Sequence, residues 1–336
     1  FSNDASFSAV SPQPTPSLTI SQPLGIVLGE DSGPIVNESI AQDSFGFLVG
    51  LQSLPGETIS LIGNGVEIQG GGLIAPHGRI EVASLAPRSS IDLVRSDNGN
   101  GVGWMLDYKT NDNQAFRDIY IENGGFIDTS SGDFEHSSGR IQLRGRRIFL
   151  GEGSEIINLN FGPSQGGDLD IVASETLTMT GALIFTSPYE GGDGGDLTIE
   201  VDGDIAMLDN TLVYLRSQEG STGNAGAFLI DAESLSIDDE SEVDTSTRGT
   251  GAAGDLTIDI ENTFSLWGES RLVSQSEIDA VGPSGSATLN VENLSVQSGS
   301  FISTSTLGDG AGGKLQINAS HGSVEVIGVS SNNGPS

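Results

Sequence analysis

A glycine-led motif that recurs at nearly constant spacing constrains the fold of this chain more than any other feature. The motif is Gly-x-Φ-x-Φ, where Φ is apolar, and its copies read GRIQL, GDLDI, GDLTI, GAFLI, GDLTI, GSATL and GKLQI. The glycines that begin these seven copies, called the anchor glycines below, are Gly139, Gly167, Gly195, Gly226, Gly254, Gly285 and Gly313. Successive anchors lie 28, 28, 31, 28, 31 and 28 residues apart, and chance does not restrict six intervals to two values. The chain therefore contains an internal structural repeat.

Each repeat contains three short segments of alternating or strand-like composition. The anchor glycine precedes the first, as in Leu197-x-Ile199-x-Val201, and a second follows, as in Ile205-x-Met207. The third is rich in Ser and Thr, as in EVDTSTRG, and a Gly-rich loop closes the repeat. Alternation of apolar and polar residues indicates strands with one face turned inward, and no segment shows helical periodicity.

Three short strands per repeat, with no helix between them, predict an all-β fold: a parallel β-helix, or solenoid, with 28–31 residues per coil in the C-terminal part. The glycines at the corners would permit turn conformations that other residues resist. At this repeat length we expect about eleven or twelve coils, stacked roughly 4.8 Å apart. The residues after the anchors should then form a column, which comprises Arg140, Asp168, Asp196, Ala227, Asp255, Ser286 and Lys314.

The sequence pattern divides the chain into four regions. Residues 1–17 are rich in Ser and Pro and are interpreted as a linker or extension. Residues 18–96 show strand and turn patterns without a clean period, with an early motif copy at Gly78, and predict irregular N-terminal coils. Residues 97–118 interrupt the pattern as a loop insert, and residues 119–336 contain the regular repeats.

The composition excludes several classes of partner and chemistry. The 336 residues include 46 Asp and Glu but 13 Lys and Arg, for a formal net charge of −33. Nucleic acids and anionic membranes are bound through clustered Lys and Arg, so neither is an expected partner. No apolar run approaches the roughly 20 residues of a membrane span, so the chain is not expected to span a membrane. The absence of Cys excludes disulfides, thiolate metal sites and cysteine nucleophiles.

One Gly- and Asp-rich loop invites a calcium interpretation. The run GGDGGDLTI, which begins at Gly191, nearly fits a nonapeptide calcium repeat and contains Asp193 and Asp196. A calcium roll, however, needs such nonapeptides in tandem, whereas these loops recur once per repeat. The sequence therefore favours a corner turn with solvated carboxylates, leaving weak surface calcium binding by Asp193 and Asp196 as the alternative and no other cofactor.

A basic cluster and an aromatic cluster are the candidate contacts for a glycan or a protein partner. The basic residues Arg144, Arg146 and Arg147 stand close together in GRIQLRGRRIF, and Trp104 and Tyr108 lie in the insert. The arginines could instead pair with carboxylates of neighbouring coils, and the aromatic side chains could instead pin the insert to the rod. The sequence favours these structural interpretations.

No residue set supports catalysis. Polysaccharide-cleaving β-helix enzymes need paired carboxylates, or a calcium site, with a basic residue acting on the sugar. The densest acidic run, residues 238–240, has no nearby His or Lys, and the three histidines, His77, His136 and His321, are scattered. We therefore expect a protein that is not an enzyme and interpret each histidine as a polar turn residue.

Two N-terminal runs carry a resemblance to a known family. LTISQPLGIVLGEDSGPIVNES (18–39) and LPGETISLIGNGVEIQGGGLIAPHGRIEVASL (54–85) resemble stretches of large cyanobacterial exoproteins of the filamentous-haemagglutinin-like, two-partner-secretion group. The element GW-x-L-x-Y from Gly103 and the repeats from Gly139 onward are similar to the same group. The resemblance implies a right-handed parallel β-helix, an outer-membrane transporter as partner of the full-length precursor, and residence outside the cell or on its outer surface.

The sequence and the resemblance together lead to one expected function and one alternative. Members of the group begin with a secretion domain bearing an NPNG-type motif, which this chain lacks, so we expect an internal or processed segment. The expected function is that of a structural exoprotein: a rigid acidic rod for adhesion, surface coat or filament formation, self-associating end to end through unpaired strand edges. The alternative is a carbohydrate- or calcium-dependent binding module of an adhesin.

Overall fold

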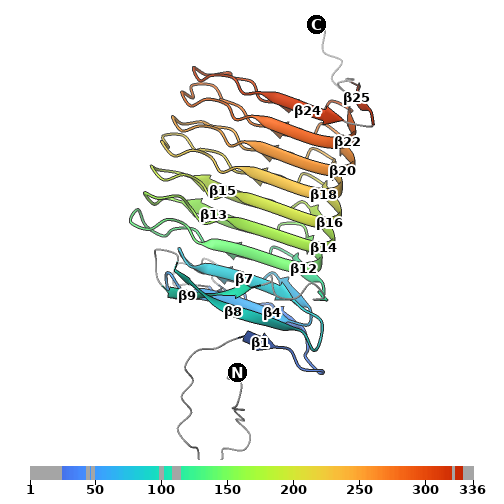
Figure 1. Ribbon diagram of the computed structural model, residues 1–336. Helices are drawn as coiled ribbons and strands as arrows, with labels where there is room; N and C mark the ends of the chain where they lie inside the picture. The colour runs from blue at the N-terminus through green and yellow to red at the C-terminus, as the bar shows by residue number, and fades with distance from the viewer. Residues whose placement is uncertain are drawn as a thin grey trace, which may run out of the picture.

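The computed structural model describes residues 25–42, 46, 50–97, 102–107, 115–319 and 322–327. Over these residues the chain is all-β and forms a parallel β-solenoid of about nine turns with about 29 residues per turn (Figure 1). The predicted fold class is confirmed. The predicted count of eleven or twelve coils is wrong, because it divides the whole length by the repeat. Part of the N-terminal half forms a separate antiparallel sheet, and the predicted extension over residues 1–17 lies outside the described residues.

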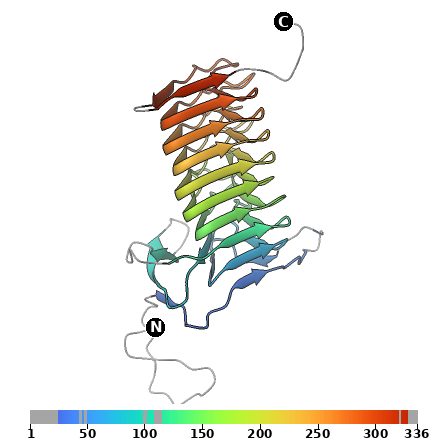
Figure 2. The same cartoon turned by 90° about the vertical axis from the view of Figure 1, so that its right-hand side faces the viewer.

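Two parallel sheets run the length of the solenoid. The larger one has 13 strands. They are β2 (Ile35–Asn37), β4 (Thr58–Gly63), β5 (Val66–Gln69), β7 (Arg79–Ser84), β10 (Ile119–Glu122), β12 (Arg140–Leu150), β14 (Leu169–Thr180), β16 (Leu197–Leu208), β18 (Phe228–Ile237), β20 (Leu256–Leu266), β22 (Ala287–Gln297), β24 (Leu315–Ala319) and β25 (Val324–Ile327). The long strands of this sheet stack in order along the rod (Figure 2).

The smaller parallel sheet has nine strands and faces the first across the core. Its strands are β3 (Leu51–Gln52), β6 (Gly72–Ile74), β11 (Phe126–Asp128), β13 (Glu155–Asn160), β15 (Leu183–Pro188), β17 (Leu212–Tyr214), β19 (Glu242–Asp244), β21 (Arg271–Val273) and β23 (Phe301–Ser303). Each strand pairs in parallel with its counterpart one turn away, as Val213 does with Val243. This is the pairing that the repeat predicts.

The two apolar runs at the start of each repeat form one long strand rather than two. In β12 the register against β14 shifts between Gly145 and Arg147, and similar shifts separate the two halves of later strands. A β-bulge of this kind bends a strand without ending its hydrogen-bonded ladder. The prediction of three separate strands per turn is therefore corrected to one long bent strand and one short strand.

The Ser/Thr-rich segment makes the remaining corner through single bridges. Isolated parallel bridges join Ser217 to Thr247, Thr247 to Ser276, and Ser276 to Thr306. The hydroxyl of Thr247 donates to the carbonyl of Gly251 at 2.7 Å and that of Ser217 to Gly223 at 2.7 Å. Short hydroxyl side chains therefore satisfy backbone carbonyls that the bend leaves without strand partners.

The core consists of apolar columns in which each turn places a side chain above that of the previous turn. One column contains Ile141, Leu169, Leu197, Phe228 and Leu256, and all five side chains are buried. Polar or charged residues alternate with them on the outward face of each strand. The period-2 alternation read from the sequence thus describes the inside and outside of the rod directly.

The anchor glycines are needed for backbone contact rather than for an unusual backbone conformation. None of them has a positive φ. A Cβ placed on Gly195 would lie 1.9 Å from the carbonyl oxygen of Gly167, and one on Gly226 would lie 2.0 Å from that of Gly195. Successive turns approach too closely at this corner for any side chain, whereas the expected turn conformations occur at other corner glycines, such as Gly153, Gly181 and Gly268, which have positive φ.

An antiparallel excursion interrupts one long strand of the N-terminal half. The first half of β12 pairs with β7 and its second half with β10, so β7 and β10 together correspond to one long strand. Between them the chain forms β8 (Ser90–Asp97) and β9 (Val102–Asp107), which join β1 (Gly25–Val27) in a three-stranded antiparallel sheet. The excursion thus starts earlier than the predicted insert of residues 97–118 and contains two strands.

The excursion covers the outward face of β7, which is buried along its whole length. Ala83 and Leu85 pack with Ile91 and Leu106 in a second, smaller core. On the same face Glu81 pairs with Arg79 at 3.3 Å and accepts the backbone N–H of Leu106 at 3.2 Å. Burial raises the pKa of Glu81, because removal from water disfavours the carboxylate more than these partners compensate.

The contact between anchor glycines predicts a position-specific cost of a single methyl group. We expect Gly195→Ala to lower the free energy of unfolding by about 1–3 kcal/mol, because its Cβ meets a carbonyl oxygen that cannot move without separating two turns. Gly191→Ala is the matched control from the same loop, where the nearest atom would lie 3.7 Å away. Urea denaturation followed by circular dichroism measures both, and equal stability of the two variants would refute the contact argument.

Candidate functional site

The last described turn of the solenoid leaves strand edges without a partner. Among the described residues, nothing pairs with the outer edges of β23, β24 and β25. The exposed side chains that would continue the core columns are Leu315, Ile317, Val324 and Val326, while Phe301 and Ile327 are exposed on the outward face. One turn earlier the equivalent Leu289 and Val296 are buried. This end therefore presents both free backbone hydrogen-bonding groups and an apolar surface.

The opposite end of the rod has the same character. Within the part of the chain that is described, β2 and β4 are the outer strands of the 13-stranded sheet, and β3 is that of the nine-stranded sheet. The exposed apolar side chains near these strands are Val36, Ile40, Leu51 and Leu54. Both sheets therefore end in exposed edges at both ends of the described solenoid (Figure 1).

The two calcium candidates accept hydrogen bonds from the next turn. The Oδ1 atom of Asp193 accepts the backbone N–H of Asn224 at 2.8 Å, and that of Asp196 accepts the N–H of Ala227 at 2.8 Å. In the same column Asp255 accepts the N–H of Ser286 at 2.7 Å. These carboxylates thus bind one turn to the next, and neither candidate belongs to a described group of three potential metal ligands.

The arginines of the basic cluster have partners within the rod. Arg146 donates from Nε to Asp118 at 2.9 Å, and Arg147 donates to the same carboxylate at 2.6 Å. The guanidinium of Arg144 lies 5.5 Å from the ring centre of Phe116. Partial burial alone would raise the pKa of Asp118, but the hydrogen bonds from Arg147 and Arg146 outweigh it and hold the pKa well below its ordinary range. The cluster fastens the end of the excursion to β12.

Of the two aromatic candidates in the insert, Trp104 belongs to the described part of the chain. Trp104 lies in β9, where its backbone pairs with Arg95 of β8, and Tyr108 lies outside the described residues. The acidic run predicted to be a turn joins β18 to β19, and its Asp239 and Glu240 have φ values of 55° and 61°. None of these residues comes together with another candidate of the sequence.

A charged groove on the nine-stranded sheet was not evident from the sequence. Arg216 pairs with Asp244 at 2.5 Å and lies 3.7 Å from the ring centre of Tyr214, while Glu242 accepts from Tyr214 at 3.0 Å and from Arg271 at 2.7 Å. Burial would lower the pKa of Arg216, but the neighbouring acids outweigh it and raise the pKa. The sequence signal that could have revealed this network is the spacing of its residues by about one repeat. Their mutual pairing indicates a structural network.

Aromatic side chains from three consecutive turns form a ladder on the surface. Phe134 and Phe161 meet edge to face with ring centres 6.2 Å apart, and Phe161 stacks on Tyr189 at 4.8 Å. The Phe134 side chain is 68% exposed. Phe134 and Phe161, together with Pro163 and Glu190, line an open groove of about 520 Å³. An exposed aromatic platform beside polar groups suits the apolar face of a sugar ring.

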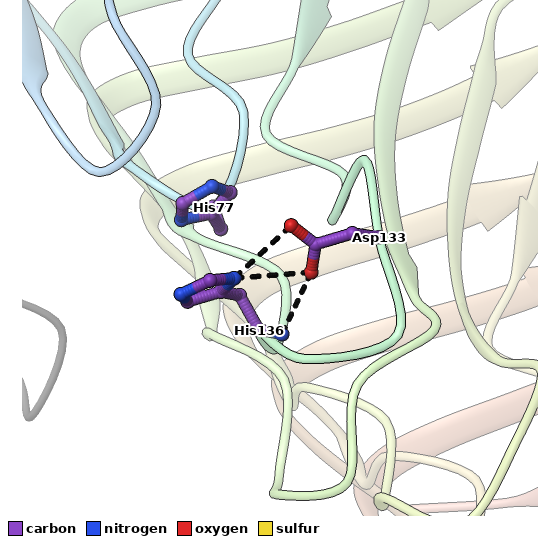
Figure 3. A group of neighbouring side chains, drawn as sticks. All are labelled: His77, Asp133 and His136. Carbon is purple, nitrogen blue, oxygen red and sulfur yellow. Dashed lines mark hydrogen bonds and ion pairs between the residues drawn. The ribbon is translucent and has the colours of Figure 1, made fainter.

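Two histidines that are far apart in sequence lie against each other beside an aspartate (Figure 3). The rings of His77 and His136 are stacked with centres 4.4 Å apart and planes 13° apart. The Nδ1 atom of His136 lies 3.0 Å and 3.1 Å from the two carboxylate oxygens of Asp133. One ligand atom from each of the three residues lies within 4.8 Å of the others.

The solenoid itself brings these residues together. His77 precedes Gly78 at the start of β7, and His136 lies in the loop before Gly139 at the start of β12; these strands are paired. Because the excursion lies between the two histidines in the sequence, their closeness in space was not evident from the sequence. Burial and His136 lower the pKa of His77, and backbone and side-chain hydrogen bonds from His136 lower the pKa of Asp133.

Comparisons with known proteins do not assign this chain to a family. No family model, curated protein or solved structure matches the chain. Within the described ranges, no helical segment has the length and apolarity needed to cross a membrane.

The Asp118 pairing predicts a stability difference that depends on pH. Asp118→Asn should lower the free energy of unfolding at pH 7 by about 1 kcal/mol, because it removes the charge paired with Arg146 and Arg147. The folded-state pKa lies well below 3.8, so this contribution is fully present above pH 3.8 and is lost gradually as the pH falls from there toward the folded-state pKa. Urea denaturation at several pH values measures the gap.

A matched control for this variant is Glu200→Gln, which removes an exposed outward carboxylate on β16. Its stability should change little between pH 7 and pH 3 relative to the parent chain. A gap for Asp118→Asn that stays constant through the acid range would contradict the pairing argument.

Proposed function

We propose that this protein is a non-catalytic structural rod that lengthens by stacking end to end. The observation that carries the proposal is the exposure of apolar, unpaired strand edges at both ends of both parallel sheets. Such edges are templates for pairing with another chain. The occupant that we propose for the edge formed by β23, β24 and β25 is the opposite end of a second copy, formed by β2, β3 and β4.

The geometry of the strands supports this choice of occupant. Because every strand of the two long sheets runs parallel to its neighbours, a second copy placed in line continues both ladders in the same direction. The surfaces that meet are different ends of the molecule, so the contact is heterologous and stays open to further addition. Such assembly produces a filament whose diameter is that of one solenoid.

Charge sets the conditions for this assembly. The formal net charge of −33 opposes the approach of two copies, while the edge strands β24 and β25 present mostly apolar and neutral side chains. Salt screens repulsion between exposed charges over a Debye length of about 8–10 Å near physiological ionic strength. Stacking should therefore strengthen as ionic strength rises, the reverse of an assembly held by ion pairs.

The sequence resemblance supports a location for the rod. We propose that it is part of a secreted or cell-surface exoprotein, exported by an outer-membrane transporter partner and serving adhesion, a surface coat or filaments. In that role the number of repeats sets the length of the rod, and the rod holds its outward loops at a fixed spacing.

Substitution of a single edge residue tests the stacking. Ile317 continues a core column on β24 and is exposed, whereas its neighbour Gln316 points away from the core. We expect Ile317→Lys to shift the concentration for filament formation upward at least tenfold, because a charge would be buried at the joint. Gln316→Lys adds the same charge on the outer face and should assemble like the parent chain.

Sedimentation and negative-stain electron microscopy at rising protein and salt concentrations measure this difference. Filaments formed equally by both variants would contradict the proposed joint. Dispersed monomers of the parent chain at high concentration, with its edge amides protected from hydrogen exchange, would indicate that the edge is covered by the chain's own C-terminal residues instead.

A second candidate function, glycan binding, is favoured by the aromatic ladder. Phe134, Phe161 and Tyr189 come from consecutive turns and so offer a row of three aromatic rings along the rod axis, in line with a polysaccharide chain laid along it. Phe134→Ala should then abolish binding on a glycan array, whereas Trp267→Ala, which removes another exposed aromatic side chain, should not. Loss of binding in Trp104→Ala instead would assign the site to the excursion.

A further inference from the structure

The cluster of His77, His136 and Asp133 combines ligand types that favour one class of ion. Imidazole nitrogen and carboxylate oxygen are together the preferred donors of zinc and related divalent transition metals. Calcium and magnesium prefer sets made of oxygen alone. The separation of His136 Nδ1 from the Asp133 oxygens, 3.0 and 3.1 Å, is close to the roughly 3.3 Å between two ligands of one tetrahedral zinc ion.

The loop that carries two of the ligands is already held in place. The Oδ1 atom of Asp133 accepts the backbone N–H groups of Glu135 and His136, each at 2.9 Å. The flank of the loop is tied to the next turn, because the Ser137 hydroxyl donates to the carbonyl of Ser164 at 2.7 Å. These bonds orient both side chains before any ion binds, which reduces the entropy lost on coordination.

The third ligand has a nitrogen atom without a protein partner. The Nδ1 atom of His77 is buried and makes no hydrogen bond with the described residues. The backbone N–H of His77 donates to Ser130 at 3.2 Å, which places the residue against the turn that contains Asp133 and His136. A buried polar atom that lacks a partner is costly, and coordination is one way to satisfy it.

We propose that His77, His136 and Asp133 bind one divalent transition metal ion of the zinc class, with solvent completing its coordination. The lone pair of an imidazole nitrogen lies in the plane of its ring, so one of the two stacked rings must rotate to share the ion. The ion takes the place of the hydrogen between Nδ1 of His136 and Asp133, and the neutral imidazole then carries its ring proton on Nε2. The ion links the turn before β7 to the loop before β12 and so joins the irregular N-terminal turns to the regular repeats.

Zinc titration of the full chain tests the site. The chain is stripped with a chelator, dialysed, and titrated with Zn²⁺ by calorimetry in excess Ca²⁺, which occupies the many surface carboxylates. We expect one Zn²⁺ ion to bind per chain even in excess Ca²⁺, and its binding to raise the unfolding temperature. Co²⁺ at the same site should show the visible absorption of a four-coordinate ion.

Three variants and one control separate the site from unspecific binding. His136→Gln and His77→Asn each remove an imidazole, and Asn tolerates the φ of 41° at residue 77. Asp133→Asn keeps the oxygen that accepts the two backbone N–H groups, so the loop should stay folded while the charge is lost. His321→Gln is the control, because it changes the remaining histidine of the chain.

We expect each of the three variants to weaken Zn²⁺ binding at least tenfold and to lose the thermal shift, with His321→Gln unchanged. Equal unfolding temperatures in chelator would show that all variants fold. Binding that the three variants retain, or a loss that His321→Gln shares, would overturn the site. Filament formation is measured separately, so failure here leaves the proposed stacking to its own test.

Discussion

Backbone contact between the anchor glycines of successive turns is the constraint on which the rest of the solenoid depends. A Cβ on Gly195 would lie 1.9 Å from the Gly167 carbonyl oxygen, and the other anchors of the regular repeats show the same closeness. Because these corners stack without side chains, the long strands on one side come within hydrogen-bonding distance along their whole length. The core columns then align in register, and one inward residue per turn meets its copy in the next. A side chain at one anchor would separate two turns and disturb both sheets at once.

Several residues of the acidic surface take part in this stacking. Asp193, Asp196 and Asp255 accept backbone N–H groups from the following turn, and Asp118 holds two arginines of β12. These carboxylates satisfy donors that the corners would otherwise leave unpaired. These carboxylates join successive turns, and the net charge of −33 makes separate rods repel each other along their sides. It does not by itself identify a partner.

The antiparallel excursion has effects at two levels. It buries the outward face of β7, so that Arg79 and Glu81 form an ion pair in a region where the regular turns have solvent. It also lengthens the sequence between two paired strands and so separates His77 from His136 along the chain, although they stack in space. His77 lies one residue before Gly78 and His136 three residues before Gly139, so their closeness follows from the pairing of β7 with β12 and not from a shared offset.

The sequence by itself determined the parallel solenoid, its repeat length and the inward and outward faces of its strands, because each depends on a local period of two residues or on a spacing near 29. It also located the excursion, although not its start or its strands. The tertiary structure decided what depends on contacts between turns. It joined two runs into one strand at a bulge, placed the anchor glycines in contact, and gave Asp196 a backbone N–H as hydrogen-bond partner. It also brought the two histidines and Asp133 together, since only the stacking of turns converts a distance in sequence into one in space.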